Sequence, residues 1–219
     1  MTFHPEPRNG IFITFEGIEG SGKSKHIAVL CEELSKAHYP VMVTREPGGT
    51  RIGEKIRDLI LDPEFSEMKS STELLLYLAS RAQHLHEQIF PALHENKIVL
   101  CDRFHDSTFA YQGGGRGIEL QVIESLIQNL FHNIKPHLTI LLDLPPRLAL
   151  DRIKNRTGFN RIDAENLAFH ETVRSNYLTL VQREPNRFRV VNSLLDFAEA
   201  HREVLAFVMA LLKEERYAI

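Results

Sequence analysis

The chain has 219 residues, which is enough for one domain that buries a full core without disulfides or a structural metal. It carries 26 Lys and Arg against 29 Asp and Glu, and this net charge of −3 argues against binding to nucleic acid or to an anionic membrane surface. The longest apolar run, residues 204–212, is about half as long as a membrane span, and the N-terminal residues contain no apolar signal-peptide core. Cys31 and Cys101 lie far apart among apolar residues, so we expect two reduced core cysteines and a cytoplasmic protein.

Short apolar runs alternate along the chain with longer stretches of helical periodicity. After a polar segment, residues 1–9, which we expect to be a flexible arm, the predicted strands are residues 11–15, 41–44, 98–101, 138–142 and 188–191. The predicted helices are residues 23–37, 72–95, 119–132, 147–154, 165–183 and 195–214. Strands that are apolar on both faces are typical of a parallel sheet with helices on both sides. The sequence therefore predicts an α/β fold with an open parallel sheet of about five strands, in a single domain spanning residues 10–219.

The first predicted strand leads into the sequence GIEGSGKS, which fits the pattern GxxxxGK[ST]. A loop of this kind between a strand and a helix binds phosphates through its backbone N–H groups and the positive end of the helix. Lys23 would reach the β- and γ-phosphates, and Ser24 would be a ligand of Mg²⁺. We therefore predict a fold of the P-loop NTPase type, with ATP bound by Gly17, Ile18, Glu19, Gly20, Ser21, Gly22, Lys23 and Ser24.

Other motifs narrow the class of nucleotide-binding protein. A GTPase would carry Asn-Lys-x-Asp for guanine, but the Asn96-Lys97 pair is followed by Ile98-Val99 at the start of a predicted strand. The chain is also too short for a large motor or translocation ATPase. These observations favour a kinase that acts on a small acceptor.

A transferring phosphoryl group needs positive charge around it, and the P-loop offers only Lys23. Asp102 and Arg103 directly follow the third predicted strand, at the end where open α/β sheets bind their ligands. Residues 152–163 carry four further cations and a glycine, and they lose the apolar period of the preceding helix. We predict that this segment is a small basic lid that closes over the phosphates.

Five segments occur in the order and spacing of a known family. They are residues 16–24, 44–50 (TREPGGT), 79–81 (ASR), 102–104 (DRF) and 110–117 (AYQGGGRG). Together they resemble bacterial thymidylate kinases, which make dTDP from dTMP and ATP, and the resemblance covers nearly the whole chain. It implies ATP as the phosphoryl donor, Mg²⁺ as the cofactor, dTMP as the acceptor and a homodimer formed through apolar helix faces.

The resemblance also implies roles at the phosphate and sugar. Arg57 and Arg103 would hold the 5′-phosphate of dTMP, and Glu19 would lie near the sugar 3′-hydroxyl. Arg156 would be the lid arginine that reaches the phosphates, with Arg161 and Arg152 as substitutes for it. The expected catalytic set is Glu19, Lys23, Arg103 and Arg156.

For the base, the resemblance implies that Tyr77 stacks on thymine, that Arg81 donates to its O4 and that Thr108 and Gln112 address its N3 edge. Tyr111 would crowd the 2′ position and so favour deoxyribose. The expected substrate-binding set is Glu46, Arg57, Tyr77, Arg81, Asp102, Arg103, Thr108, Tyr111 and Gln112.

Two alternatives remain open at this point. The first is a kinase for another pyrimidine monophosphate, dUMP or UMP, because Tyr77 and Arg81 favour thymine without excluding uracil. The second is a nucleotide-binding regulatory protein with a silent site, which the joint presence of Lys23, Asp102 and Arg103 disfavours. The eleven histidines show no zinc-ligand spacing, so we expect no zinc site.

Overall fold

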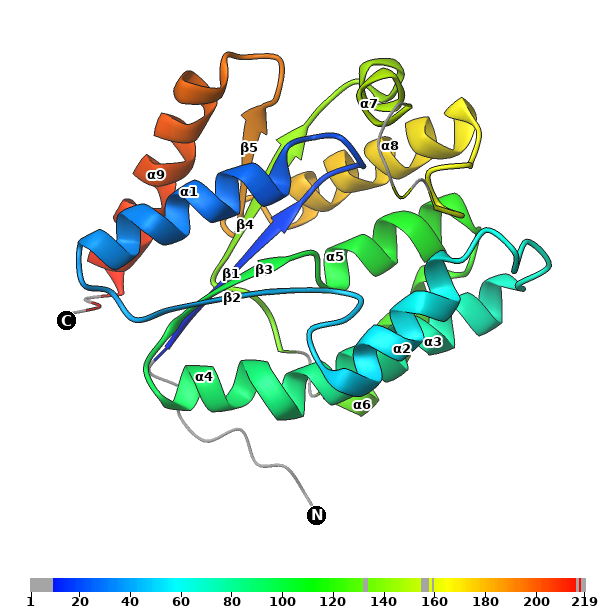
Figure 1. The fold of residues 1–219 in the computed structure, drawn as a ribbon, viewed down its shortest axis with the longest axis horizontal. Coiled ribbons are helices and arrows are strands. Elements are labelled where there is room, and N and C mark those ends of the chain that lie inside the picture. The colour runs from blue at the N-terminus through cyan, green and yellow to red at the C-terminus, as the bar shows by residue number, and fades with distance from the viewer. Residues whose placement is uncertain (1–9, 132–133, 155–157, 159, 216, 218–219) are drawn as a thin grey trace.

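A computed structural model describes residues 10–131, 134–154, 158, 160–215 and 217. Its centre is one parallel sheet in the order β2-β3-β1-β4-β5 (Figure 1), which confirms the predicted fold class. The strands are β1 (Ile11–Glu16), β2 (Val41–Arg45), β3 (Ile98–Asp102), β4 (Leu138–Asp143) and β5 (Phe188–Asn192).

Helical segments connect the strands and cover both faces of the sheet (Figure 1). They are α1 (Lys23–Lys36), α2 (Arg51–Leu61), α3 (Ser70–His84), the π-helical η1 (Leu85–Ile89), α4 (Phe90–His94), α5 (His105–Thr108), the π-helical η2 (Phe109–Gly115), α6 (Leu120–Phe131), α7 (Pro146–Ile153), α8 (Leu167–Arg183) and α9 (Phe197–Glu214). None of the helices in the described ranges is long and apolar enough to cross a bilayer.

Alternate residues of β1 point into two different cores. Ile11, Ile13 and Phe15 pack against α1 and α9 on one face of the sheet. Phe12 packs on the opposite face, against α3, α4 and α6. A third cluster joins α8 to the start of α7 and to Ile18 in the loop after β1. Because the first strand is buried on both faces, the loop that follows it has a rigid base.

Two helical regions were not predicted from the sequence, and one predicted helix is less regular than expected. The α2 helix contains Gly53, and η2 ends in three consecutive glycines, so both have low intrinsic helix propensity. The predicted helix 72–95 is α3, η1 and α4 in direct succession. The π-helical turn ends at Ile89, two residues before Pro91, which lacks the N–H needed to continue an α-helical ladder.

The strand order places β1 between β3 and β4, so the connection after β1 leads to β2 on one side of the sheet and the connection after β4 leads to β5 on the other side. Ligands of open α/β sheets bind at such a switch point, beyond the carboxyl ends of the strands. The register brings Phe15 of β1 and Arg45 of β2 alongside Asp102 of β3 at this edge. The predicted site residues therefore meet here although they lie far apart in the sequence.

Candidate active site

The loop between β1 and α1 has a backbone that requires glycine at both fixed glycine positions of its GxxxxGK pattern. Gly17 has a φ of 134°, and a Cβ there would lie 2.5 Å from the carbonyl oxygen of Leu142. Gly22 precedes α1 with a φ of 95°. Side chains other than hydrogen are strained in this left-handed region, so the GxxxxGKS sequence is needed to build this turn.

Lys23 is held inside this loop. Its Nζ donates to the carbonyl oxygens of Gly17, at 3.0 Å, and Ile18, at 3.1 Å, and the residue is 8% exposed. Burial, followed by the nearby charge of Arg103, lowers the pKa of Lys23 to about 8. The ammonium group is thus fixed in place at the N-terminus of α1, and this cradle fits the phosphates of a nucleoside triphosphate.

A pair of oxygen ligands lies next to the lysine. The hydroxyl of Ser24 donates to Asp102 Oδ2 at 2.9 Å, which joins the P-loop to the end of β3. Hydroxyl and carboxylate oxygens are the donors that Mg²⁺ prefers, and Mg²⁺ usually completes its shell with water and substrate phosphates. The donor set at this position therefore fits Mg²⁺.

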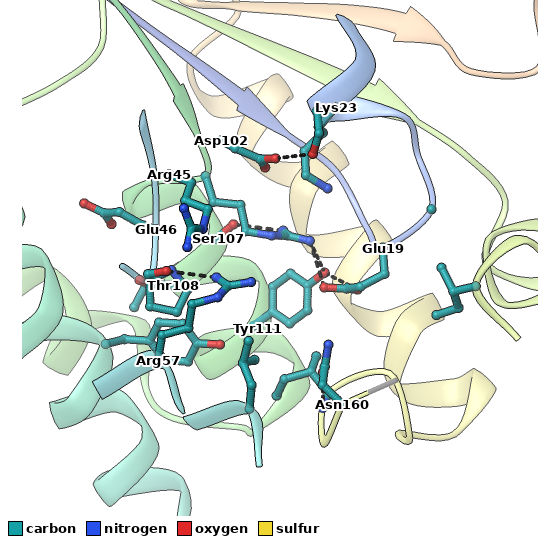
Figure 2. A pocket seen from close by; sticks show the side chains of 18 of the residues that line it. Glu19, Lys23, Arg45, Glu46, Arg57, Asp102, Ser107, Thr108, Tyr111 and Asn160 are labelled. Atoms are coloured by element: carbon teal, nitrogen blue, oxygen red, sulfur yellow. Dashed lines mark hydrogen bonds and ion pairs between the residues drawn. The ribbon is translucent and has the colours of Figure 1, made fainter. Parts of the chain in front are cut away.

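The P-loop opens into a cavity of about 470 Å³ (Figure 2). Gly17, Ile18 and Ser21 belong to the loop but do not line the cavity. Arg45, Ser107 and Asn160 also line the cavity, although they were not predicted as site residues. Of these, Arg45 could have been predicted, because it lies at the carboxyl end of a strand. The predicted residues that line it are Glu19, Gly20, Gly22, Lys23, Ser24, Glu46, Arg57, Tyr77, Asp102, Arg103, Thr108, Tyr111 and Gln112.

Four arginines line the cavity beyond the P-loop: Arg152 from α7, and a group of three, Arg45, Arg57 and Arg103. The Arg57 guanidinium donates to the carbonyl oxygen of Pro47 at 2.8 Å, and Arg45 pairs with Glu54 at 2.7 Å. Burial, and then repulsion from Arg45, lowers the pKa of Arg57 below its usual value, although the group remains a cation. Three fixed guanidinium groups in one cavity are suited to an anionic substrate group such as a phosphate.

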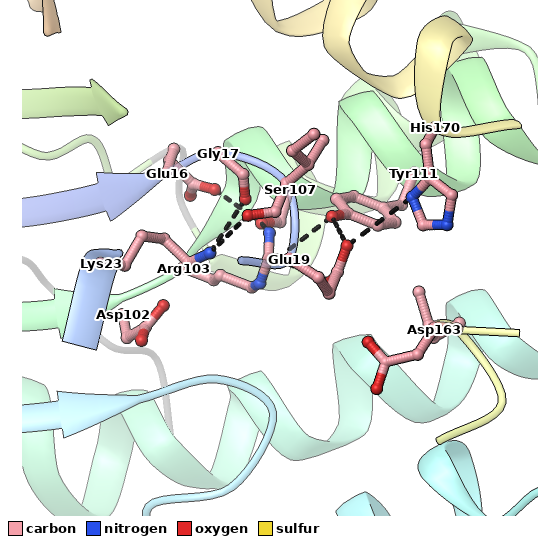
Figure 3. A network of polar contacts seen from close by, with 12 residues as sticks. Glu16, Gly17, Glu19, Lys23, Asp102, Arg103, Ser107, Tyr111, Asp163 and His170 are labelled. Atoms are coloured by element: carbon pink, nitrogen blue, oxygen red, sulfur yellow. Dashed lines mark hydrogen bonds and ion pairs between the residues drawn. The ribbon is translucent and has the colours of Figure 1, made fainter. Parts of the chain in front are cut away.

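Arg103 is the centre of a polar network (Figure 3). Its Nη1 donates to Ser107 Oγ at 3.1 Å and to Tyr177 Oη at 3.0 Å. Its Nη2 donates to Glu19 Oε1 at 2.8 Å and to Tyr111 Oη at 3.1 Å. Arg103 also has a φ of 73°, a left-handed conformation that is rare for a residue with a side chain and that is found at functional sites. Four oxygen acceptors therefore fix the direction of this guanidinium.

Glu19 closes the network on the P-loop side. Its Oε2 accepts from Tyr111 Oη at 2.7 Å. Burial raises the pKa of the Glu19 carboxyl, but the charges of Arg103 and Lys23 outweigh it, so the pKa lies below its usual value. Glu19 is therefore a fixed anion between two cations, at the place where the P-loop meets the rest of the cavity.

The sequence analysis did not single out Glu16, which lies beneath this network at the end of β1. Its Oε1 accepts from the backbone N–H of Phe104 at 2.7 Å. Its Oε2 accepts from Ser107 Oγ at 2.6 Å and from Tyr177 Oη at 2.8 Å, the same two hydroxyls that accept from Arg103. The local signal that marks Glu16 is an acidic residue at the end of a fully buried strand that is otherwise uncharged.

The stability of the fold is expected to depend on pH through Glu16. Burial, and to a smaller extent the charge of Asp106, raises the pKa of Glu16 from 4.5 to about 7. Between these values the unfolded chain loses its proton before the folded one does, so the stabilising contribution falls as the pH rises. Glu16→Gln cannot titrate, so wild type should lose stability relative to this variant between pH 4.5 and 7.5. Urea unfolding of both proteins measures the difference, and a constant difference across this range would contradict the assignment.

Arg81 is not where the sequence analysis placed it. It does not line the cavity and is 1% exposed, whereas direct donation to thymine O4 was expected. Its Nε donates to Glu46 Oε2 at 2.6 Å and its Nη1 to Thr108 Oγ1 at 2.9 Å. Its Nη2 donates to the carbonyl oxygen of Phe104 at 3.0 Å. Arg81 lies behind the cavity wall because it pairs with the buried carboxylate of Glu46. Through its hydrogen bonds, Arg81 holds Glu46 and Thr108, two residues of the cavity wall, in place.

The lid prediction is only partly covered by the structure. Arg156 lies outside the described residues. Arg161 is buried and donates to Glu73 and to the carbonyl oxygen of Ile60, so in this structure its guanidinium is paired away from the P-loop. Arg152, at the end of α7, lines the cavity and donates to the carbonyl oxygen of Gly20 in the P-loop at 3.2 Å.

A P-loop with a buried lysine that opens onto an arginine-lined cavity is suited to transferring a phosphoryl group between two phosphorylated substrates. This combination of fold and site is typical of P-loop kinases. A family model described as thymidylate kinase matches residues 15–204. A thymidylate kinase of Pelobacter propionicus is 45% identical over 206 residues, covering 91% of this chain and 94% of the relative. A thymidylate kinase of Trichlorobacter lovleyi is 46% identical over 208 residues, covering 92% and 98%.

A solved structure agrees with these relatives. The crystal structure of thymidylate kinase from Ehrlichia chaffeensis matches with a TM-score of 0.74 and 34% identity, covering 91% of this chain and 98% of that one. The chain belongs to the thymidylate kinase family. The resemblance found in the five sequence segments is therefore confirmed.

Proposed function

We propose that the described residues transfer the γ-phosphoryl group of ATP to the 5′-phosphate of dTMP, giving dTDP, in the arrangement set out below. The activity is that of the family to which the chain belongs. The observation that carries the arrangement is one continuous cavity with the P-loop in its wall, four arginines beyond the loop, and Tyr77, Thr108 and Gln112 among the remaining lining. dTMP-dependent formation of ADP from ATP tests the proposal, and ATP turnover that does not depend on dTMP would contradict it.

On the donor side, Lys23 and the backbone N–H groups of residues 17–24 bind the phosphates of ATP. Lys23 is buried and pre-positioned, so it neutralises charge without rearranging during the reaction. Ser24 and Asp102 would hold Mg²⁺, which neutralises charge on the β- and γ-phosphates when bound. In the part of the lid that the structure describes, Arg152 is the cation closest to this role, and Arg156 remains a prediction from the sequence.

On the acceptor side, Arg57 and Arg103 hold the 5′-phosphate of dTMP and aim its oxygen at the donor. Phosphoryl transfer depends mainly on positioning and on neutralising charge, and planar guanidinium groups bind phosphate with defined direction. Glu19 lies between Arg103 and Tyr111, so it limits how far Arg103 can swing. We place the 3′-hydroxyl of the sugar next to Glu19.

The base lies between Tyr77, which stacks on it, and the polar side chains of Thr108 and Gln112, which face its N3 edge. Arg81 acts on the base through Thr108, to which it donates. A flat aromatic ring with fixed polar neighbours is suited to a pyrimidine.

Tyr111 is expected to discriminate against ribose. Its ring lines the cavity, and its hydroxyl is held by Glu19 and Arg103, so it cannot move away from an added 2′-hydroxyl. Wild type should prefer dTMP over ribo-TMP by about 10- to 100-fold in kcat/KM, the effect of burying an unpaired hydroxyl. Tyr111→Ala should narrow this gap, whereas Tyr111→Phe should lower activity and keep the gap. Equal use of both sugars by wild type would mean that Tyr111 is only a core residue.

We also propose that the enzyme is a homodimer that works in the cytoplasm. Leu75 on α3 is 59% exposed, and Val122 and Leu130 on α6 are 46% and 53% exposed. These helices share one core, and large exposed apolar side chains are typical of an interface. Cys31 and Cys101 are free thiols, as expected in a reducing compartment. Sedimentation velocity should give a dimer, and Val122→Glu with Leu130→Glu should give a monomer; a monomeric wild type would contradict the proposal.

A further inference from the structure

Glu73, on α3, is a buried carboxylate with donors on both of its oxygens. It is 1% exposed. Its Oε1 accepts from Gln112 Nε2 at 2.9 Å and from Arg116 Nε at 3.1 Å. Its Oε2 accepts from Arg116 Nη2 at 3.1 Å and from Arg161 Nη2 at 2.5 Å. Two guanidinium groups and one amide therefore hold this carboxylate, which the mechanism above does not use.

The Glu73 side chain is ionised at neutral pH. Burial raises the pKa of the carboxyl, but the hydrogen bonds from Arg116 and Gln112 outweigh this and hold the pKa below its usual value. An ionised carboxylate has acceptors only. The atom that Gln112 turns towards Glu73 must therefore be its nitrogen, whichever way the amide could otherwise be placed.

The orientation of this amide determines what Gln112 offers to a ligand. Gln112 is 1% exposed and lines the cavity. One of the two N–H groups of Nε2 is used by Glu73, and the amide branch that points away from Glu73 ends in the carbonyl oxygen Oε1, which is an acceptor that a base can meet. Thymine and uracil carry an N–H at position 3, whereas cytosine carries a bare acceptor nitrogen there. The acceptor oxygen of Gln112 can accept a hydrogen bond from the N3–H of thymine or uracil. With cytosine, the same oxygen would face the acceptor nitrogen N3, and no hydrogen bond could form.

We propose that Glu73 is a positioning residue for base specificity, which fixes the amide of Gln112 so that its oxygen faces the pyrimidine and selects a base with an N3–H group. The inference rests on the proposed placement of the base beside Tyr77, Thr108 and Gln112. Arg116 bridges both oxygens of Glu73, and Arg161 binds the oxygen that Gln112 does not contact, so the carboxylate is held in place; Arg116 also pairs with Glu165 at 2.5 Å.

The position of Glu73 in the fold supports this role. Tyr77 lies four residues further along α3, so the stacking ring and the carboxylate lie on the same side of one helix. Gln112 belongs to η2, and Ile162, a wall residue, directly follows Arg161. One carboxylate therefore joins the three segments that surround the proposed base position.

The test compares kcat/KM for dTMP and for dCMP in matched variants. In Glu73→Gln, residue 73 can turn either its oxygen or its nitrogen towards Gln112, so the Gln112 amide is no longer fixed. We expect the dTMP-to-dCMP ratio to fall by about tenfold or more, since a mismatched buried hydrogen bond typically changes affinity by this factor or a larger one. The control is Arg116→Gln, which removes a donor from the same carboxylate but leaves its bond to Gln112. That variant should keep the wild-type ratio even where its KM values rise.

A second variant keeps the proposal testable if Glu73→Gln does not fold. Gln112→Met has a similar size but lacks the amide oxygen, and Glu73 keeps both arginines in it. It should lower the ratio to the same extent. An unchanged ratio in Gln112→Met or in folded Glu73→Gln, or an equal fall in Arg116→Gln, would overturn the proposal. Wild type that forms no ADP with dTMP would instead refute the proposed function itself.

Discussion

Replacing Lys23 with alanine is expected to lower kcat by at least about 10²–10³-fold, the usual cost of losing one fixed donor to a developing charge. The Lys23 ammonium is buried and held by the carbonyl oxygens of Gly17 and Ile18, so no neighbouring cation occupies the same position. Binding of dTMP, measured by calorimetry without ATP, should change little, because we place Lys23 at the donor phosphates. Steady-state kinetics with saturating ATP measures the effect.

The matched control is Lys36→Ala, at the opposite end of the same helix. Lys36 is exposed and pairs only with Glu32 one turn away, so its removal should leave kcat near the wild-type value. Circular dichroism shows whether both variants keep the fold. Near-normal kcat in folded Lys23→Ala would mean that the loop does not bind the transferring phosphate.

Replacing Arg103 with alanine is expected to lower kcat/KM for dTMP by on the order of 10³-fold, at the lower end of the range for a phosphate-directed arginine. The variant loses the guanidinium that we propose binds the acceptor phosphate, which is also the partner of Glu19 at 2.8 Å. Without Arg103 the pKa of the buried Glu19 carboxyl should rise, since the charge of Arg103 now lowers it. Lysine should rescue only part of the activity, because an ammonium cannot reproduce the planar fork that contacts Tyr177 and Tyr111 on its two sides.

Arg174→Ala is a suitable control for Arg103→Ala. Arg174 makes a bidentate pair with Asp143 at the end of β4, at 2.7 and 2.8 Å, and it does not line the cavity. Its loss removes an ion pair near the same edge of the sheet without touching the acceptor position, so kcat/KM should stay within a few-fold of wild type. If Arg103→Ala behaved like this control, Arg103 would be a structural residue only.

Local patterns predicted the parts of the site that depend on neighbouring residues in the sequence. The P-loop is a continuous stretch between an apolar strand and an amphipathic helix, so its place followed from periodicity and glycine spacing. Asp102 was placed correctly at the sheet edge for the same reason, because it ends an apolar strand.

The partners of buried polar groups could not be predicted in this way. Glu16 and Tyr177 are hydrogen-bonded across 161 positions of sequence, and nothing in the stretch around Tyr177 distinguishes it from a core aromatic. Arg81 and Arg161 were expected to face ligands, but each is drawn inward by a buried carboxylate, Glu46 or Glu73. A single sequence shows which residues carry charge, whereas the fold decides which of those charges neutralise one another.

A coupled ADP-release assay across a panel of nucleoside monophosphates tests most directly the claim that this cavity phosphorylates a thymine deoxynucleotide. With ATP and Mg²⁺, the enzyme should release ADP fastest with dTMP, more slowly with dUMP, and about 10- to 100-fold less efficiently with dCMP, which lacks the N3–H group. Ribo-TMP and UMP should be poorer acceptors than dTMP and dUMP, because Tyr111 stands against the sugar. ADP release that is equal for dTMP and dCMP, or faster with UMP than with dTMP, would contradict the claim.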